Sequence, residues 1–354
     1  MATATSGDAL NLTTAGSISA TSNVTMTAYS SAAGNGVYTD GPIAVTGTGN
    51  IIIYSRSVGV GTYYALYSSK PITTNSGSIT VQGAALTAGG VATTSTGYAS
   101  AGRMAATGNI TLLGNSTAGF GVHINNAGTA ITVVSSAGNI IINGSTTSGT
   151  YGLSADDGQL TATVGSISST SPGGIYINKA WQAGTSLSLT GTTTTGWGVY
   201  AGTLGTLTSG TSLLIDGSGQ YGSYFAAQVS AGSSLIVKGL GAIGYGIQTS
   251  TAGTLRSVNA MSLIGYSTSG GTAIYLDGLV QVTGAGDLTM SARNAGTTAN
   301  TYGIYAAKAI SVVNGTATMQ GATNTAGVIA AAPGTAAYGY TYGIYFAGTS
   351  SLTA

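Results

Sequence analysis

The sequence predicts an all-β fold: a parallel β-helix (β-solenoid) of about 12 coils of roughly 26 residues, with three short strands per coil. Three observations predict it. Gly makes up 59 of the 354 residues, and Ser and Thr are abundant, which favours strands and turns over helices. Aliphatic residues recur regularly, unlike in a flexible linker. Short strand patterns also return in one order along the chain, with no helical pattern between them.

The first strand of each coil has Gly, an aliphatic residue and then, in most copies, Tyr. The clearest copies are Gly36-Val37-Tyr38, Gly174-Ile175-Tyr176, Gly198-Val199-Tyr200, Gly303-Ile304-Tyr305 and Gly343-Ile344-Tyr345. A corner often follows, as at Asp40-Gly41 and Asp277-Gly278. Asp and Gly tolerate the backbone angles that a sharp bend between strands requires.

Two further strands complete the coil. A short alternating strand follows the corner, as at Ile43-Ala44-Val45 and Ile131-Thr132-Val133. The third strand opens on Gly and a small polar residue, as at Gly49 to Ile53 and Gly138 to Ile142, and recurs at intervals of 20 to 31 residues. Alternation places the aliphatic residues on one face, and stacking at about 4.8 Å closes a core. Residues 1–354 are therefore expected to form a single continuous solenoid domain.

Aromatic residues hold two of the repeat positions. Alternation turns the residue after the aliphatic one outward, so we expect a surface ladder of tyrosines that stack on each other or contact a sugar ring or a neighbouring shaft. This ladder consists of Tyr38, Tyr67, Tyr176, Tyr200, Tyr224, Tyr275, Tyr305 and Tyr345. A second set precedes the strand glycine, and the same alternation predicts that it faces inward and covers that glycine. It consists of Phe120, Tyr151, Trp197, Tyr221, Tyr245, Tyr302 and Tyr342.

Charge is sparse along the chain. Eight basic residues against seven acidic residues give a net charge of +1, and the basic residues stand singly, which argues against a nucleic-acid partner. Weak repulsion between copies favours end-to-end or lateral self-association. No signal peptide and no apolar run of about 18 residues is visible, so no membrane span is expected. The repeat begins and stops in mid-pattern, which indicates a segment of a longer chain or a stacking subunit.

Catalytic, cofactor and metal sites are not predicted. The pair Asp156-Asp157 stands in a corner before Gly158, and a glycosidase pair of Asp157 with a carboxylate one coil away, such as Asp216, is the enzymatic alternative. His123 takes a ladder position, as a solvent-facing variant of Tyr. The stretch from Gly239 to Gly244 matches a dinucleotide-binding fingerprint, but a strand pattern follows where that chemistry needs a helix.

Short strands that open on Gly-Asn-Ile or Gly-Ser-Ile, few charges and no Cys resemble the shafts of filamentous-haemagglutinin-type adhesins and autotransporter passengers. The resemblance covers nearly the whole chain. It implies a right-handed β-helix and an extracellular position on a bacterial cell surface. The Asn-Pro signature of that family's secretion domain does not occur here, so the resemblance does not extend to the secretion route.

Two functional hypotheses follow, and neither involves catalysis. The first is a non-enzymatic structural shaft of a large secreted bacterial surface adhesin, which supplies reach and stiffness while glycan or host-surface contacts are made elsewhere or at its edges. The second is a self-assembling extracellular filament or sheath, in which solenoid subunits stack end to end. Fibres of the purified chain in negative-stain microscopy would favour the second hypothesis, and persistent monomers the first.

Overall fold

The computed structural model describes residues 1–31, 34–58, 63–86, 96–100, 102–125, 131–148, 151–296, 302–323, 329–331, 342–347 and 350–353. Strands are the only regular secondary structure in these ranges. The chain divides into two compact units, Met1–Gly184 (unit 1) and Thr185–Ala354 (unit 2). Both are parallel β-solenoids, which confirms the predicted fold class. A single continuous domain over residues 1–354 stays a prediction.

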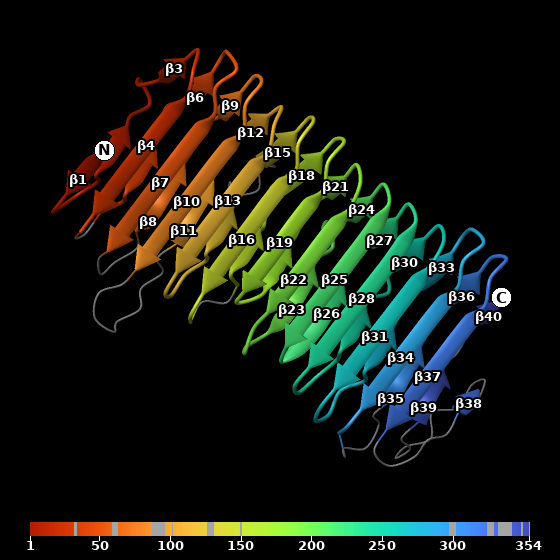
Figure 1. Cartoon of the computed structure of the whole chain (residues 1–354). Coiled ribbons are helices and arrows are strands. Elements are labelled where there is room, and N and C mark those ends of the chain that lie inside the picture. Colours follow the sequence, from red (N-terminus) through yellow and green to blue (C-terminus); the bar gives the residue numbers. More distant parts are fainter. Residues whose placement is uncertain are drawn as a thin grey trace. The chain divides into compact units, whose positions relative to one another are not determined.

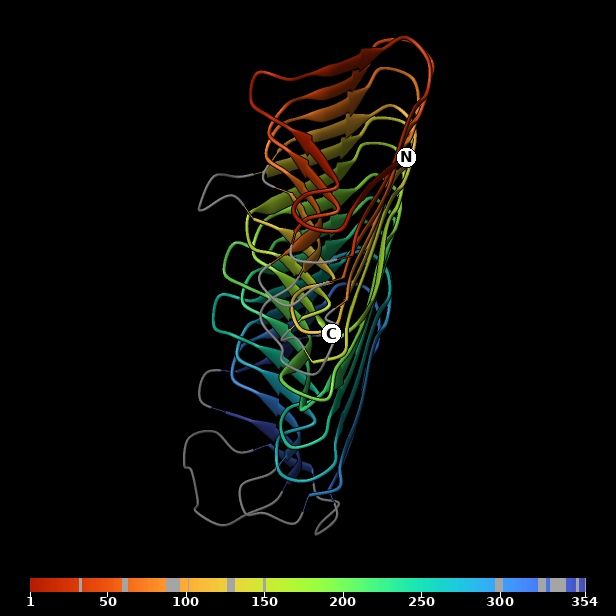
Figure 2. The same cartoon turned by 90° about the vertical axis from the view of Figure 1, so that its left-hand side faces the viewer.

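Each turn contributes one strand to each of three parallel sheets, here named A, B and C in chain order. Within each unit the strands of sheet A run side by side across the face seen in Figure 1, and the chain advances as a right-handed helix. Figure 2 shows the successive turns of each unit as stacked loops. The three-strand repeat predicts the coiling, and the right-handed sense agrees with the β-helix that the family resemblance implies.

In unit 1, sheet A consists of β1 (Ala2–Ala4), β4 (Val24–Ser30), β7 (Ile51–Val58), β10 (Ile79–Leu86), β13 (Ile110–Ser116), β16 (Ile140–Thr146) and β19 (Ile167–Pro172). Sheet B consists of β2 (Leu10–Leu12), β5 (Val37–Thr39), β8 (Tyr64–Ser68), β11 (Thr96–Ser100), β14 (Val122–Ile124), β17 (Leu153–Ala155) and β20 (Ile175–Ile177). Sheet C consists of β3 (Ile18–Ala20), β6 (Ile43–Val45), β9 (Ile72–Thr74), β12 (Met104–Ala106), β15 (Ile131–Ser135), β18 (Gly158–Ala162) and β21 (Trp181–Ala183).

In unit 2, sheet A consists of β22 (Leu187–Thr192), β25 (Ser212–Gly219), β28 (Ser234–Gly241), β31 (Met261–Ser267), β34 (Leu288–Asn294) and β37 (Ala317–Thr323). Sheet B consists of β23 (Trp197–Ala201), β26 (Tyr221–Phe225), β29 (Ile247–Thr249), β32 (Ile274–Leu276), β35 (Tyr302–Ala306), β39 (Tyr342–Phe346) and β38 (Ile329–Ala331). Sheet C consists of β24 (Leu207–Ser209), β27 (Gln228–Ala231), β30 (Thr254–Ser257), β33 (Leu279–Val282), β36 (Ile310–Val312) and β40 (Leu352–Thr353).

The core is a set of aliphatic columns that run from coil to coil. In sheet A of unit 1, Ile79 pairs in register with Ile110, which pairs with Ile140, and all three side chains are fully buried. Burial of each such side chain contributes about 1.5–3 kcal/mol. Because equal side chains occupy equal positions, each coil covers the apolar face of the next, which no coil could bury alone.

The polar residue that opens the third strand links coils through its side chain. The side-chain oxygen of Asn109 accepts the backbone N–H of Asn139 at 2.8 Å, and that of Asn139 accepts the N–H of Ser166 at 2.8 Å. These bonds satisfy backbone donors at the point where the strand begins. They give a physical reason for the Gly-Asn-Ile pattern.

Glycine lets sheets A and B touch along the second half of several sheet A strands. A Cβ on Gly222 of β26 would lie 2.7 Å from the backbone nitrogen of Leu240 in β28 and 2.1 Å from the carbonyl oxygen of Gly246. A Cβ on Gly217 of β25 would lie 2.6 Å from the carbonyl oxygen of Gly222. No other residue permits so close an approach of two backbones. The sheet A strands are therefore longer than the pattern of three aliphatic positions suggests.

Candidate functional site: the outer aromatic band

The predicted tyrosine ladder lies on the outer face of sheet B. All eight tyrosines are half-buried and follow a buried residue, which is aliphatic in every case except Ser223 before Tyr224; in β23, for example, Val199 is buried and Tyr200 is half-buried. Backbone register aligns them: Tyr38 pairs with Tyr67, Tyr200 with Tyr224, and Tyr305 with both Tyr275 and Tyr345. The paired tyrosines therefore lie in register on the outer side of sheet B.

The ladder forms short stacked runs of two or three rings rather than one unbroken row. Ring centroids lie 5.0 Å apart for Tyr38 and Tyr67, 4.8 Å for Tyr200 and Tyr224, and 4.6 Å for Tyr275 and Tyr305. Gln248 takes the ladder position between Tyr224 and Tyr275. In the stacked runs, the ring of the next coil covers each ring face. The ladder therefore exposes ring edges and hydroxyl groups to solvent.

The expectation that the second aromatic set faces inward is wrong. Trp197, Tyr221 and Tyr302 are half-buried on the same side as the ladder. The Trp197 ring lies 4.7 Å from that of Tyr221 and 5.1 Å from that of Tyr224. Phe120, Tyr151 and Tyr245 likewise contact rings of the ladder position, whereas the side chain of Tyr342 lies outside the described residues.

A bend at the strand glycine explains this correction. In β23, Gly198 and Val199 are both buried, so two consecutive residues face inward and the alternation is broken. The register passes from Trp197–Tyr221 to Val199–Ser223 without a Gly198 pair. Strict alternation across the glycine therefore predicts the wrong face for the aromatic residue that precedes it. The two sets together form one outer surface, here called the aromatic band.

Burial and neighbouring charges raise the pKa of tyrosines in the aromatic band. Burial first, then the nearby Tyr305 and Asp277, raise the pKa of Tyr275 to about 12. Burial and then the charge of Asp40 raise the pKa of Tyr38. Asp40 and Asp277 lie two residues after their tyrosines at the corner, and Asp277 accepts a hydrogen bond of 2.6 Å from the hydroxyl of Thr251. The tyrosines therefore stay protonated, as hydrogen-bond donors beside carboxylates.

His123 and Asp156 lie together at an interruption of the ladder. The Nε2 atom of His123 is 3.0 Å from Oδ2 of Asp156, and Ser154 donates its hydroxyl proton to the same oxygen at 2.7 Å. Burial raises the pKa of Asp156, but the hydrogen bonds from His123 and Ser154 and the charge of His123 outweigh it and lower that pKa. Ser154 is bonded to the carboxylate rather than to the imidazole, so these groups lack the order of a nucleophile–base–acid triad.

The remaining residues considered for catalysis or cofactor binding lie at a corner, on the outer face of a sheet, or in a strand and the bend after it. Asp157 is buried at the corner between sheets B and C, 3.7 Å from Nζ of Lys179, whereas Asp216 lies on the outer face of sheet A. Gly239 and Gly241 belong to β28 and residues 242–244 form the bend that follows, so the fingerprint runs out of a strand and opens no helix. Within the described ranges, no group of three metal-ligating side chains comes together, and no helix is long and apolar enough to cross a membrane.

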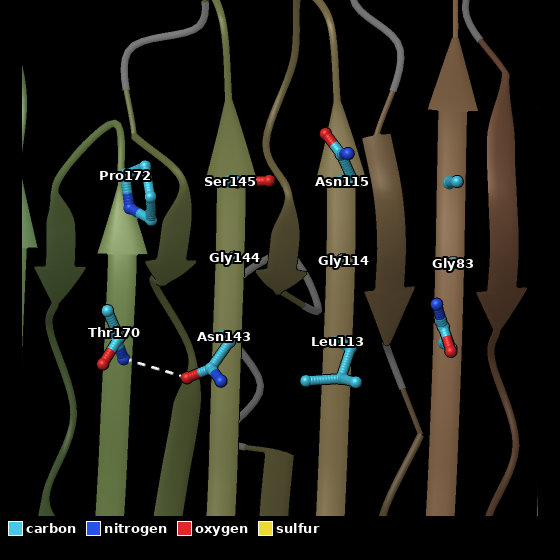
Figure 3. A pocket seen from close by; sticks show the side chains of 11 residues that line it. Gly83, Leu113, Gly114, Asn115, Asn143, Gly144, Ser145, Thr170 and Pro172 are labelled. Carbon is cyan, nitrogen blue, oxygen red and sulfur yellow. Dashed lines mark hydrogen bonds between the residues drawn. The ribbon is translucent and has the colours of Figure 1, made fainter.

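A shallow pocket on the outer face of sheet A, not foreseen from the sequence, lies where β16 and β19 part (Figure 3). Backbone pairing of these strands stops at Ile142 and Ser169. The N–H of Thr170 instead donates a hydrogen bond of 2.9 Å to the side-chain oxygen of Asn143. Pro172 has no N–H with which to continue the ladder. The pocket encloses about 260 Å³, is lined by Leu113, Asn115, Ser145 and their neighbours, and holds no ionisable side chain.

Comparisons with known proteins do not assign the chain. No family model, no curated protein and no solved structure matches it.

Proposed function

We propose that this chain is a non-enzymatic structural shaft of a large secreted bacterial surface adhesin. The observation that carries the proposal is the register: within each unit, side chains of one kind stack on their equivalents from coil to coil, both in the core and in the aromatic band. Such a body resists bending and shortening, because every coil shares its backbone hydrogen bonds and its apolar surface with its neighbours.

The outward aromatic residues support the same function. The stacked ring faces of Tyr275 and Tyr305 are directed at each other, at an interplanar angle of 2°, so they strengthen coil-to-coil contact. Each such pair contributes about 0.5–1.5 kcal/mol beyond its buried area. The ladder therefore serves cohesion of the shaft, and recognition of glycans or host surfaces belongs to other parts of the adhesin.

The test is a length-replacement experiment in the full-length protein on the cells that make it. Deletion of the coils in frame should abolish adhesion to a receptor held beneath a polymer brush, while adhesion to a bare receptor surface persists. An unrelated solenoid of equal length should restore adhesion beneath the brush, and one of half the length should not. Restoration only by this sequence, or loss of adhesion on the bare surface, would contradict a spacer role.

A further inference from the structure

Five tyrosines of the aromatic band in unit 2 form one cluster of contacting rings. The ring centroid of Tyr305 lies 4.6 Å from that of Tyr275 and 5.5 Å from that of Tyr345. Tyr245 adjoins Tyr275 at 5.3 Å, and Tyr302 adjoins Tyr305 at the same distance. Rings in contact exchange electrons readily, so a ring that has lost an electron can take one from its neighbour. Two such losses anywhere in the cluster can therefore meet on adjacent rings.

Tyr275 and Tyr305 have the geometry that a bond between two phenol rings requires. Their strands, β32 and β35, pair in register, and the ring planes are 2° apart. Equal positions of the two rings therefore lie next to each other, including the Cε carbons beside the hydroxyl groups. The ring centres of two phenols joined through these carbons are about 4.3 Å apart, which is one C–C bond plus two ring radii. Because the present separation is 4.6 Å, the rings can join by tilting, while both strands keep their places.

We propose that Tyr275 and Tyr305 are a modification site at which a one-electron oxidant of the peroxidase class couples the two rings into dityrosine. Each phenol gives one electron to the oxidant and its hydroxyl proton to water, and the two phenoxyl radicals form a C–C bond between Cε carbons. The hydrogen on each bonded carbon then moves to the phenol oxygen, which restores both hydroxyl groups. Hydrogen peroxide takes up the two electrons and two protons and becomes two water molecules. The product links β32 to β35 covalently.

The surroundings of the pair favour this chemistry. Burial first, with the charge of Asp277 among the further causes, raises the pKa of both Tyr275 and Tyr305, so this carboxylate acts on both rings. The same negative charge stabilises the positive charge that develops on a ring as its electron leaves. The chain has no Cys, so no thiol consumes the oxidant first and no disulfide can link two coils. A covalent bond between coils goes beyond the shaft function and depends only on the geometry of the rings.

The test is photo-oxidation of the purified chain with tris(bipyridyl)ruthenium(II) and persulfate, followed by tryptic digestion and mass spectrometry. Cleavage after Lys and Arg places the two tyrosines in separate peptides, residues 257–293 and 294–308. A joined product, lighter by two hydrogen atoms than the two peptides together, should appear, with fragment ions that place the bond at Tyr275 and Tyr305. The fraction of linked chains should stay constant on dilution, because the bond forms within one chain. A fraction that falls on dilution would show coupling between chains and overturn the proposal.

Two variants and an unfolded sample serve as controls. Tyr275→Phe keeps the ring and should abolish the joined product. Tyr266→Phe is the matched control, because Tyr266 lies in the same peptide but on the outer face of β31 in sheet A, and the product should persist. The wild type unfolded in urea should lose the product, since only the fold holds the two rings together. Absence of the product from the folded wild type, equal yield from the unfolded chain, or a product that survives in Tyr275→Phe would each contradict the assignment. Thermal melts by circular dichroism confirm that each variant is folded.

Discussion

The rings of Tyr275 and Tyr305 lie in consecutive coils with centroids 4.6 Å apart and planes 2° apart. Their strands, β32 and β35, pair in register through Ile274 and Ile304, which point into the core from the adjacent positions. One backbone register therefore aligns an inner aliphatic contact and an outer aromatic one.

Loss of a stacked ring should cost stability. Tyr275→Ser removes both the stack on Tyr305 and the contact with Tyr245, and we expect a loss of about 2 kcal/mol in the free energy of unfolding. Tyr275→Phe keeps the ring and should lose less than half of that. Denaturant titration of both variants measures the difference. Equal stability of Tyr275→Ser and the wild type would show that the ladder serves contacts with other molecules instead.

Alkaline pH should destabilise the protein through Tyr275. Its pKa is raised from 10.0 to about 12 on folding, so the folded state holds the phenol proton that the unfolded state releases first. Stability is therefore full below pH 10 and falls as the pH rises from 10 through about 12. The midpoint of thermal unfolding should fall more steeply in the wild type than in Tyr275→Phe over this window. Parallel curves would contradict this assignment.

Acid should weaken the corner at Asp156. Its pKa lies below the ordinary value of 3.8 in the folded state, so its stabilising contribution is present above that value and is lost as the pH falls through the folded pKa. Asp156→Asn removes this titration. Between neutral pH and acid, the wild type should lose more stability than Asp156→Asn. A steeper loss in the variant would show that other groups dominate acid unfolding.

The contact between sheets A and B should tolerate no side chain at its glycines. Gly222→Ala places a methyl group against the backbone of Gly246 and Leu240, and we expect a loss of about 2–3 kcal/mol, typical of overpacking. Gly196→Ala is the control, because a Cβ there meets no atom within 4 Å and only its φ of 79° is unfavourable, at about 1 kcal/mol. Chemical denaturation compares the two. A larger loss at Gly196 would contradict the close contact.

The periodic features of this protein can be predicted from its amino-acid pattern. The coil length, the order of three strands, the inward aliphatic columns and the outward tyrosines all follow from alternation within strands and from positions that repeat. The confirmed pairs Ile110–Ile140 and Tyr200–Tyr224 are examples. Such features are local, because a side chain's face depends only on its neighbours in an extended strand.

Features that depend on how two sheets meet could not be predicted from the amino-acid pattern. Alternation fails at Gly198 because sheet B bends there against the backbone of sheet A, and this bend turns Trp197 outward beside Tyr224. The opening between β16 and β19 depends on Asn143 replacing a backbone partner. Distances between backbones, rather than the preferences of single residues, set these outcomes.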